Sequence, residues 1–376
     1  MRKLKFGINA CRARSGGMKT HLHGILSNLD KEFLKSYDVI IWAYPDLVEE
    51  FSSFQNIVFK TNKYLSSQLF FQVFWELILF KKELESENVD VLLSLDGTVL
   101  VTFDRHIVMS RDMLSYEPGV LEGYRMGYQK LRIFLIRIIQ NRAFRRATSV
   151  IFLTSYAKDL IIKSCGKVSD FTIIPHGVST KFIEIGNQRL KTGRPVKNIL
   201  FTSTIDIYKN QWNLVEALSI LRSKGYELNL HLVGGAVNVK AYEMTCEAIS
   251  KYDPQGSFVY YHGHLAHTEL SKLMLSMDLF CFASSCETMP NTLIEAMCSG
   301  LPIVCSNRGP MPEILKDAGI YFDPYSADDI ASVVERVIND DVLLKLMAEK
   351  ARIYSDIYSW KTCSDKTFNL VKSVLG

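Results

Sequence analysis

The sequence predicts an α/β protein with two domains, each built on a doubly wound parallel sheet. Its 376 residues are too many for one ordinary hydrophobic core. Apolar runs such as 279–283 and 301–305 are unbroken, which is typical of strands buried on both faces, and a short helical pattern joins them as a crossover unit. A polar segment with Gly and Pro at 186–197 reads as a linker. We therefore expect domains at 1–185 and 198–357, followed by a terminal helix within 358–376.

Composition narrows the class of protein. The chain is 48% hydrophobic and 22% charged, which indicates a folded protein. Residues 1–180 hold 24 Lys and Arg against 18 Asp and Glu, so this half is basic and favours a phosphate, a diphosphate lipid or a membrane surface as partner. No nucleic-acid motif accompanies the charge, and we expect no nucleic-acid partner. Eight scattered cysteines without a C-x-x-C pair, no signal-like start and no membrane-length apolar run predict a cytoplasmic protein.

The stretch from Asp278 to Leu315 carries the strongest functional pattern. Glu287 lies in the loop between the strand expected at 279–283 and the helix that follows it, and Glu295 lies one turn into that helix. The residues between them that begin the helix would present backbone N–H groups to a phosphate; they are Thr288, Met289, Pro290 and Asn291. One carboxylate on each side of that phosphate is placed to accept sugar hydroxyl protons.

This stretch, with S-S-C-E, E-A-M-C-S-G-L-P-I-V and G-P-M-P-E, resembles the signature of retaining family 4 glycosyltransferases, within glycosyl transferases group 1. The resemblance implies the GT-B fold, two Rossmann-like domains facing a cleft, with the C-terminal helix crossing back to the first domain. It implies that Glu295 binds the nucleotide ribose and that Glu287 lies near the donor sugar. No acidic D-x-D cluster is found, and we expect neither an obligatory metal nor a cofactor.

In the first domain, we expect strands at 3–10, 38–44, 56–60, 89–95, 106–110 and 149–154. Gly16 and Gly17 follow the first strand and either approach a ligand closely or make a tight turn. The aromatic-rich helix at 68–82 is interpreted as core, with a partly exposed apolar face as the alternative. Arg111 stands where family members often have histidine, and either holds a phosphate or forms a surface pair with Asp112. His176 fits the P-x-G-V element that closes the N-terminal domain in the family.

The segment from Glu122 to Ala147 is basic and apolar in alternation. Its seven cations are Arg125, Lys130, Arg132, Arg137, Arg142, Arg145 and Arg146. A basic amphipathic helix is typical of a membrane-surface element. The alternative is a helix that packs on the sheet with a solvated basic edge.

In the second domain, we expect strands at 198–203, 229–235, 258–263, 279–283, 301–305 and 319–323. The family usually has an arginine and, five residues later, a lysine directed at the donor diphosphate; here these positions are Thr204 and Lys209. Gly234 and Gly235 match a close backbone approach beside the nucleotide, and the loop with His264 borders the base in relatives. Three histidines, at 262, 264 and 267, also allow the interpretation of a zinc site. The alternative is that this loop leads into a helix that begins at Thr268 and Glu269.

Together with the resemblance, the sequence therefore predicts a retaining glycosyltransferase that uses a UDP-, GDP- or dTDP-linked sugar in surface-polysaccharide synthesis. We expect its acceptor to be a glycan that is linked to a lipid. The acceptor would bind the first domain, and the protein would be cytoplasmic or peripheral at the membrane. Lys209 and Glu287 are the expected catalytic residues. A sugar-nucleotide epimerase or phosphorylase of the same fold, and a non-catalytic partner subunit, remain alternatives.

Overall fold

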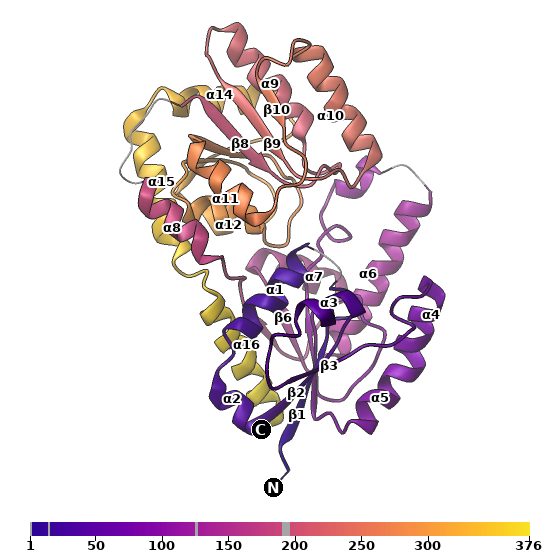
Figure 1. Ribbon diagram of the computed structural model, residues 1–376. Helices are drawn as coiled ribbons and strands as arrows, with labels where there is room; N and C mark the ends of the chain where they lie inside the picture. The colour runs from indigo at the N-terminus through magenta and orange to yellow at the C-terminus, as the bar shows by residue number, and fades with distance from the viewer. Residues whose placement is uncertain (1, 14–15, 125–126, 190–195) are drawn as a thin grey trace. The chain divides into compact units, whose positions relative to one another are not determined.

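The computed structural model describes residues 2–13, 16–124, 127–189 and 196–376, and it divides into two compact units (Figure 1). Unit 1 comprises Met1–Glu117, Arg125–Gly177 and Tyr358–Gly376. Unit 2 comprises Pro118–Tyr124 and Val178–Ile357. Each unit has its own parallel sheet with helices packed on it, which confirms the predicted pair of doubly wound α/β domains.

Unit 1 contains a seven-stranded sheet in the order β3-β2-β1-β4-β5-β6-β7, and its neighbouring strands pair in parallel. Its strands are short and mostly buried, as the unbroken apolar runs predicted. They are β1 (Leu4–Asn9), β2 (Tyr37–Trp42), β3 (Ile57–Lys60), β4 (Val91–Ser94), β5 (His106–Met109), β6 (Ser149–Phe152) and β7 (Phe171–Ile173). Its helices are α1 (Gly16–Ser27), α2 (Lys31–Ser36), α3 (Pro45–Glu50), α4 (Leu69–Phe74), α5 (Phe80–Ser86), α6 (Tyr128–Arg146), α7 (Ser155–Cys165) and α16 (Trp360–Leu375), with a π-helical turn η1 (Trp75–Leu79) between α4 and α5.

Unit 2 contains a six-stranded sheet in the order β10-β9-β8-β11-β12-β13, again with parallel pairings. The strands are β8 (Asn198–Thr202), β9 (Asn229–Val233), β10 (Val259–Tyr261), β11 (Leu279–Phe282), β12 (Ile303–Ser306) and β13 (Gly319–Phe322). The helices are η2 (Val120–Gly123, 3-10), α8 (Thr180–Arg189), α9 (Gln211–Ser223), α10 (Val239–Tyr252), α11 (His267–Ser276), α12 (Asn291–Cys298), α13 (Met311–Leu315), α14 (Ala327–Ile338) and α15 (Asp341–Ser355).

Two helices differ in the structure from their predicted form. The helix expected as core over 68–82 is split by η1; Trp75 and Phe80 stack in the core with ring centroids 4.5 Å apart, whereas Phe70 is 74% exposed. The basic helix expected from Glu122 begins only at Tyr128, because Gly127 precedes it with a φ of 153° that favours glycine. Arg125 lies outside the described residues.

The boundary between the units lies at Gly177, eight residues before the expected end of the first domain. The apolar residues Phe182 and Ile185 put α8 with unit 2, where it packs on α11 and α12. Within the predicted linker at 186–197, residues 186–189 therefore end a helix, and 190–195 lie outside the described residues.

The C-terminal helix α16 is part of unit 1 and packs on α1 (Figure 1). Trp360, its first residue, is in tight contact with two glycines. A Cβ at Gly24 would lie 2.2 Å from the Trp360 ring, and a Cβ at Gly177 would lie 2.2 Å from its backbone nitrogen. No larger residue fits at either position unless Trp360 moves. Gly177, the last residue of unit 1 before the long segment of unit 2, is thus held against Trp360, two residues after the chain returns to unit 1 at Tyr358.

Candidate functional site

The strand order of unit 2 marks the place where a ligand site is expected. Chain order runs outward from β8 to β10 in one direction and from β11 to β13 in the other, so the direction reverses between β8 and β11. The crevice outside the carboxyl ends of strands at such a reversal is the usual ligand site of open α/β sheets. The loops that follow β8 and β11 supply six of the eleven site residues predicted in unit 2.

Hydrogen bonds connect these two loops. The backbone N–H of Ser285 donates to the Tyr208 carbonyl at 2.8 Å, and the Asn210 side chain donates to the Ala283 carbonyl at 2.9 Å. Asn210 is buried with a φ of 58°, a left-handed conformation that asparagine tolerates better than most residues. The two loops therefore form one supported structure, and the residues on them keep a defined spacing.

Lys209 and Glu287 meet across these loops. The Lys209 ammonium donates to Glu287 Oε1, and both side chains are largely buried. The ammonium also lies 4.8 Å from the centre of the Tyr208 ring. A buried lysine held by one carboxylate and one aromatic face retains donor capacity for a second anion. The two predicted catalytic residues are thus in direct contact.

Glu295 lies on the next helix and is unusual among the described carboxylates. It is 5% exposed, and its Oε2 has no hydrogen-bond partner within the described residues. Burial alone raises the pKa of Glu295 to about 7. His267 Nδ1 is 3.9 Å from Glu295 Oε1, but desolvation lowers the pKa of His267, so the imidazole is mostly neutral at pH 7. Glu295 is a buried acceptor with unused capacity.

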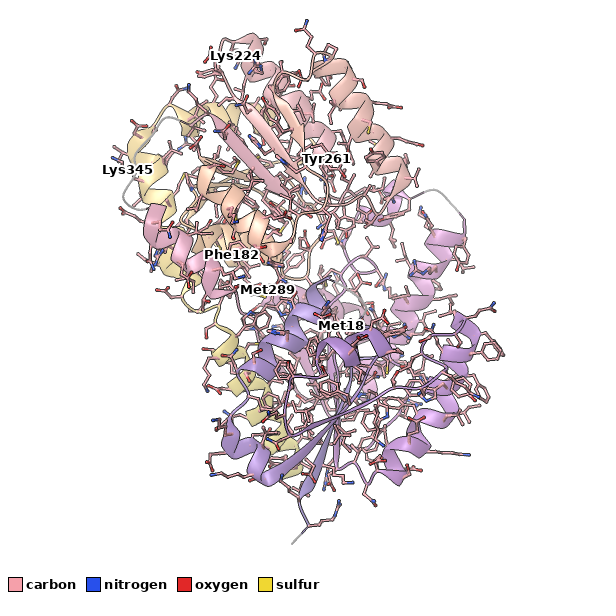
Figure 2. The ribbon with its side chains drawn as sticks, viewed as in Figure 1. Met18, Phe182, Lys224, Tyr261, Met289 and Lys345 are labelled. Carbon is pink, nitrogen blue, oxygen red and sulfur yellow. The ribbon has the colours of Figure 1, made fainter. Side chains whose placement is uncertain are left out.

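The amino end of α12 lies between these two glutamates in the chain. Pro290 precedes the helix and offers no side-chain cap, and the first turn holds no acidic residue. Thr288 and Met289 (labelled in Figure 2) are buried in the loop that leads to it, and Asn291 begins the helix. An uncapped helix start with a positive dipole end suits an anion.

A glycine pair after β9 lies beside the loop that follows β8. A Cβ at Gly234, where φ is 139°, would lie 2.0 Å from the Ser203 carbonyl, so only glycine fits there. A Cβ at Gly235 would lie 4.0 Å from the His264 Cβ, and Thr204 is exposed. Tyr261 (labelled in Figure 2) donates its hydroxyl to the Gly234 carbonyl at 3.0 Å. Four of the predicted donor-site residues are therefore brought close to one another.

The structure adds residues that sequence reasoning did not identify. The Tyr124 hydroxyl donates to Asp206 at 3.3 Å, a contact between residues 82 positions apart that no local pattern announces. A Cβ at Gly309, where φ is 59°, would lie 3.8 Å from the Glu287 backbone nitrogen, so the loop after β12 also borders this glutamate. The G-P pair at 309–310 indicates a turn from the sequence alone, but the sequence does not reveal that this turn lies beside Glu287.

Four of the predicted site residues lie in unit 1. Gly16, with a φ of 64°, begins α1, and Gly17 follows it. His176 is buried, with its Nδ1 2.9 Å from the Nδ1 of His21, and burial lowers the pKa of both histidines well below 6.5. Arg111 follows β5, and desolvation lowers its pKa to about 10, so it remains a cation beside this pair. The Arg111 side chain is partly buried, so it is not a fully solvated surface arginine.

The three histidines at the end of β10 do not gather into a ligand set. His262 instead pairs with His231, with ring nitrogens 3.0 Å apart. Across the described ranges, no group of three or more His, Cys, Asp or Glu side chains is placed to hold a metal ion. In the same residues, no helix has both the length and the apolar character needed to cross a membrane.

Residues 185–354 match the family model described as glycosyl transferases group 1. This span contains Lys209, Glu287 and Glu295. Unit 2 is a glycosyl transferases group 1 domain. The predicted resemblance to glycosyl transferases group 1 is confirmed for this domain, and the whole chain has the GT-B fold. That fold is shared with the Anabaena protein HepE, solved with UDP and glucose, at a TM-score of 0.74 and 17% identity over 98% of this chain and all of that one.

The chain is also similar to curated relatives. The O-antigen chain mannosyltransferase B of Escherichia coli is 29% identical over 31% of this chain and 30% of its own length. The MMP alpha-(1->4)-mannosyltransferase of Mycolicibacterium hassiacum is 23% identical over 63% of this chain and 57% of its own. Matches to curated relatives span between 22% and 57% of those proteins.

Proposed function

We propose that this protein is a retaining glycosyltransferase that moves a sugar from a nucleoside-diphosphate sugar to a glycan acceptor. The observation that carries the proposal is the arrangement in unit 2 of a paired lysine, an uncapped helix start and a buried carboxylate with a free oxygen. Together, these features and Glu287, the partner of the lysine, offer groups for the ribose, the diphosphate and the sugar of a sugar nucleotide. Glu295 accepts two ribose hydroxyls, Lys209 and the start of α12 hold the diphosphate, and Glu287 orients the sugar.

In this mechanism, charge stabilisation is the main task of the protein. When the sugar–phosphate bond breaks, negative charge grows on the departing diphosphate while the sugar becomes oxocarbenium-like. The Lys209 ammonium and the α12 amides face that negative charge. Glu287 is already aligned by its bond to Lys209, so the carboxylate lies near the positive sugar and the ammonium near the negative phosphate. Retention of anomeric configuration and the nature of the donor base are part of the proposal.

The acceptor is assigned to unit 1 and is proposed to be lipid-linked, in the synthesis of a cell-surface polysaccharide. Support comes from the names of the relatives, one of which is called O-antigen chain mannosyltransferase B. It also comes from α6, whose described cations are Lys130, Arg132, Arg137, Arg142, Arg145 and Arg146. A helix of this charge favours peripheral attachment to an anionic membrane. The protein is accordingly proposed to act at the cytoplasmic face of a membrane.

The direct test is release of nucleoside diphosphate from UDP-, GDP- and dTDP-sugars in the presence of membrane lipid extracts. One donor class should give release in the wild type. Lys209→Ala should lower turnover roughly 100- to 1,000-fold, the usual cost of losing one preorganised charge-stabilising group. Adding Thr204→Arg to that variant should recover part of the loss, since position 204 is exposed and borders Gly234.

A matched control removes a lysine of the same domain that has no role in the proposal. Lys224 (labelled in Figure 2) pairs with Glu335 on the surface, and Lys224→Ala should leave turnover near that of the wild type. A non-catalytic partner subunit is the competing function, favoured by Thr204 in place of an arginine. It predicts nucleotide binding without release for any donor.

A further inference from the structure

Unit 1 contains a cavity of about 340 Å³ that none of the predicted site residues lines. Part of its wall is the segment 99–104, which leads into β5, and another part is His106, the first residue of that strand. Arg146 precedes β6 and also lines it. The cavity therefore lies at the amino edge of the sheet, whereas Arg111 and the glycines that begin α1 follow the carboxyl ends of their strands. Its volume is in the range of small-molecule sites.

Three cations converge on this cavity from two helices. They are Lys81 of α5 and Arg142 and Arg146 of α6. Asp104 is the acidic residue in the lining, and Lys81 is 3.8 Å from the exposed Glu85. Among the described residues, no carboxylate forms an ion pair with either arginine. Burial lowers the pKa of His106 to about 4, so this histidine adds no positive charge at neutral pH. The cavity thus has a net positive lining and unused guanidinium donors.

On both chain segments that supply these cations, exposed apolar side chains lie in the helical turns that precede the cations. On α6, the exposed residues Leu131, Leu135 and Ile138 share one face with Arg142 and Arg146, because their spacing is four, three, four and four. The chain from α4 to α5 repeats the order, with exposed apolar residues first and Lys81 after them. Those residues are Leu69, Phe70, Phe71, Phe74, Leu77 and Ile78, at 38% to 74% exposure. So many exposed large side chains in one run mark an interaction surface.

We propose that the cavity binds the phosphate of an anionic phospholipid, and that the acyl region of the membrane contacts the exposed apolar residues of α4, η1 and α6. The charge of the lining complements a phosphate, and two arginines suit its oxygens. A water-soluble phosphate would use the cations alone, whereas a lipid also covers the apolar side chains. The inference rests on the membrane-attachment part of the proposed function and names the lipid class and the residues that recognise it.

The test is co-sedimentation of the full chain with vesicles of phosphatidylglycerol or of phosphatidylcholine at low salt. The wild type should bind phosphatidylglycerol strongly and phosphatidylcholine weakly. Arg142→Gln with Arg146→Gln should lower binding to phosphatidylglycerol at least about tenfold, because both cavity arginines are lost. The matched control is Arg132→Gln with Arg145→Gln, two exposed arginines of α6 outside the cavity. It removes the same charge and should lower binding only about two- to threefold.

A second pair of measurements separates the lipid from free phosphate and checks the apolar contact. Phe70→Ser with Leu131→Ser, both exposed, should weaken vesicle binding while leaving the melting temperature unchanged. Glycerol phosphate should stabilise the wild type far less than short-chain phosphatidylglycerol below its micelle concentration. Equal stabilisation by both would assign the cavity to a soluble phosphate and overturn the proposal.

The remaining outcomes are distinguishable. Equal losses in the two arginine pairs would mean general charge attraction, which ends the cavity proposal but leaves membrane attachment intact. If the wild type binds neither kind of vesicle, both the cavity proposal and the membrane-attachment proposal are wrong. Nucleotide binding to unit 2, measured separately on each variant, reports on the donor site alone, so its presence or absence decides neither question.

Discussion

Replacement of Glu295 by glutamine should stabilise the free protein at alkaline pH and weaken nucleotide binding. Burial raises the pKa of this carboxyl from 4.5 to about 7 in the folded state. Between these values, the folded chain holds a proton that the unfolded chain releases. The stabilising effect of that proton is complete below pH 4.5 and is lost as pH rises through 7. Glutamine cannot ionise, so the variant does not suffer this loss.

The magnitude follows from the size of the shift. One pKa unit corresponds to about 1.4 kcal/mol, so the wild type gives up roughly 3 kcal/mol between pH 4 and pH 8 at this one group. For a domain of the size of unit 2, 1 kcal/mol moves the melting temperature by about 2–4 °C. Glu295→Gln should therefore melt roughly 6–12 °C above the wild type at pH 8 and close to it at pH 5. Relaxation around the carboxylate makes this an upper range.

Ligand binding should change in the opposite direction. Hydrogen bonds to a charged acceptor contribute about 1.5–3 kcal/mol each, so nucleotide affinity should fall at least about tenfold in the variant. The assay is differential scanning calorimetry at both pH values, with and without nucleoside diphosphate. Glu335→Gln serves as control, because its hydrogen bond from Lys224 lowers the pKa of Glu335 and the change should bring no gain at pH 8. A Glu295→Gln protein that melts below the wild type at pH 8 would refute the reasoning.

Three further outcomes are expected. Lys209→Ala should keep unit 2 folded but lower its thermal stability, because the largely buried Glu287 loses its cation; a variant as stable as wild type in calorimetry would contradict the pairing. Gly234→Ala should destabilise far more than Gly225→Ala in urea unfolding, since both have positive φ but only Gly234 lacks room for a Cβ; equal effects would point to backbone strain alone. The buried neutral pair His21 and His176 should make unit 1 less stable as pH falls below 6.5, because only the unfolded chain takes up those protons; a urea midpoint unchanged between pH 7 and pH 5 would exclude this.

The sequence was informative where local patterns are strong. Apolar runs predicted twelve of the thirteen strands; the exception is the edge strand β7, whose three residues are exposed or only partly buried. The glutamate-bearing stretch located the loop and helix that hold Glu287 and Glu295. Gly234 was singled out from the sequence, and the structure shows why this residue is glycine, since a Cβ there would clash with the Ser203 carbonyl. These features depend on residues close together in the chain.

Features that depend on distant contacts were not predictable. The end of the first unit was expected at 185 and lies at 177, because the packing of α8 on α11 and α12 decides the boundary. The aromatic helix at 68–82 was expected in the core, yet periodicity does not reveal which face the sheet covers, and Phe70 is exposed. Only the fold shows that Glu295 Oε2 has no hydrogen-bond partner among the described residues and that Tyr124 is hydrogen-bonded to Asp206.

The central claim is that unit 2 recognises the diphosphate and the ribose of a sugar nucleotide through Lys209 and Glu295. Isothermal titration calorimetry with UDP-, GDP- and dTDP-sugars, and with the matching nucleosides, tests it most directly. The account predicts that one base class binds, that the nucleoside alone binds much more weakly, and that Lys209→Ala removes the difference between them. Binding of no sugar nucleotide, or equal binding of nucleoside and nucleotide by the wild type, would contradict it.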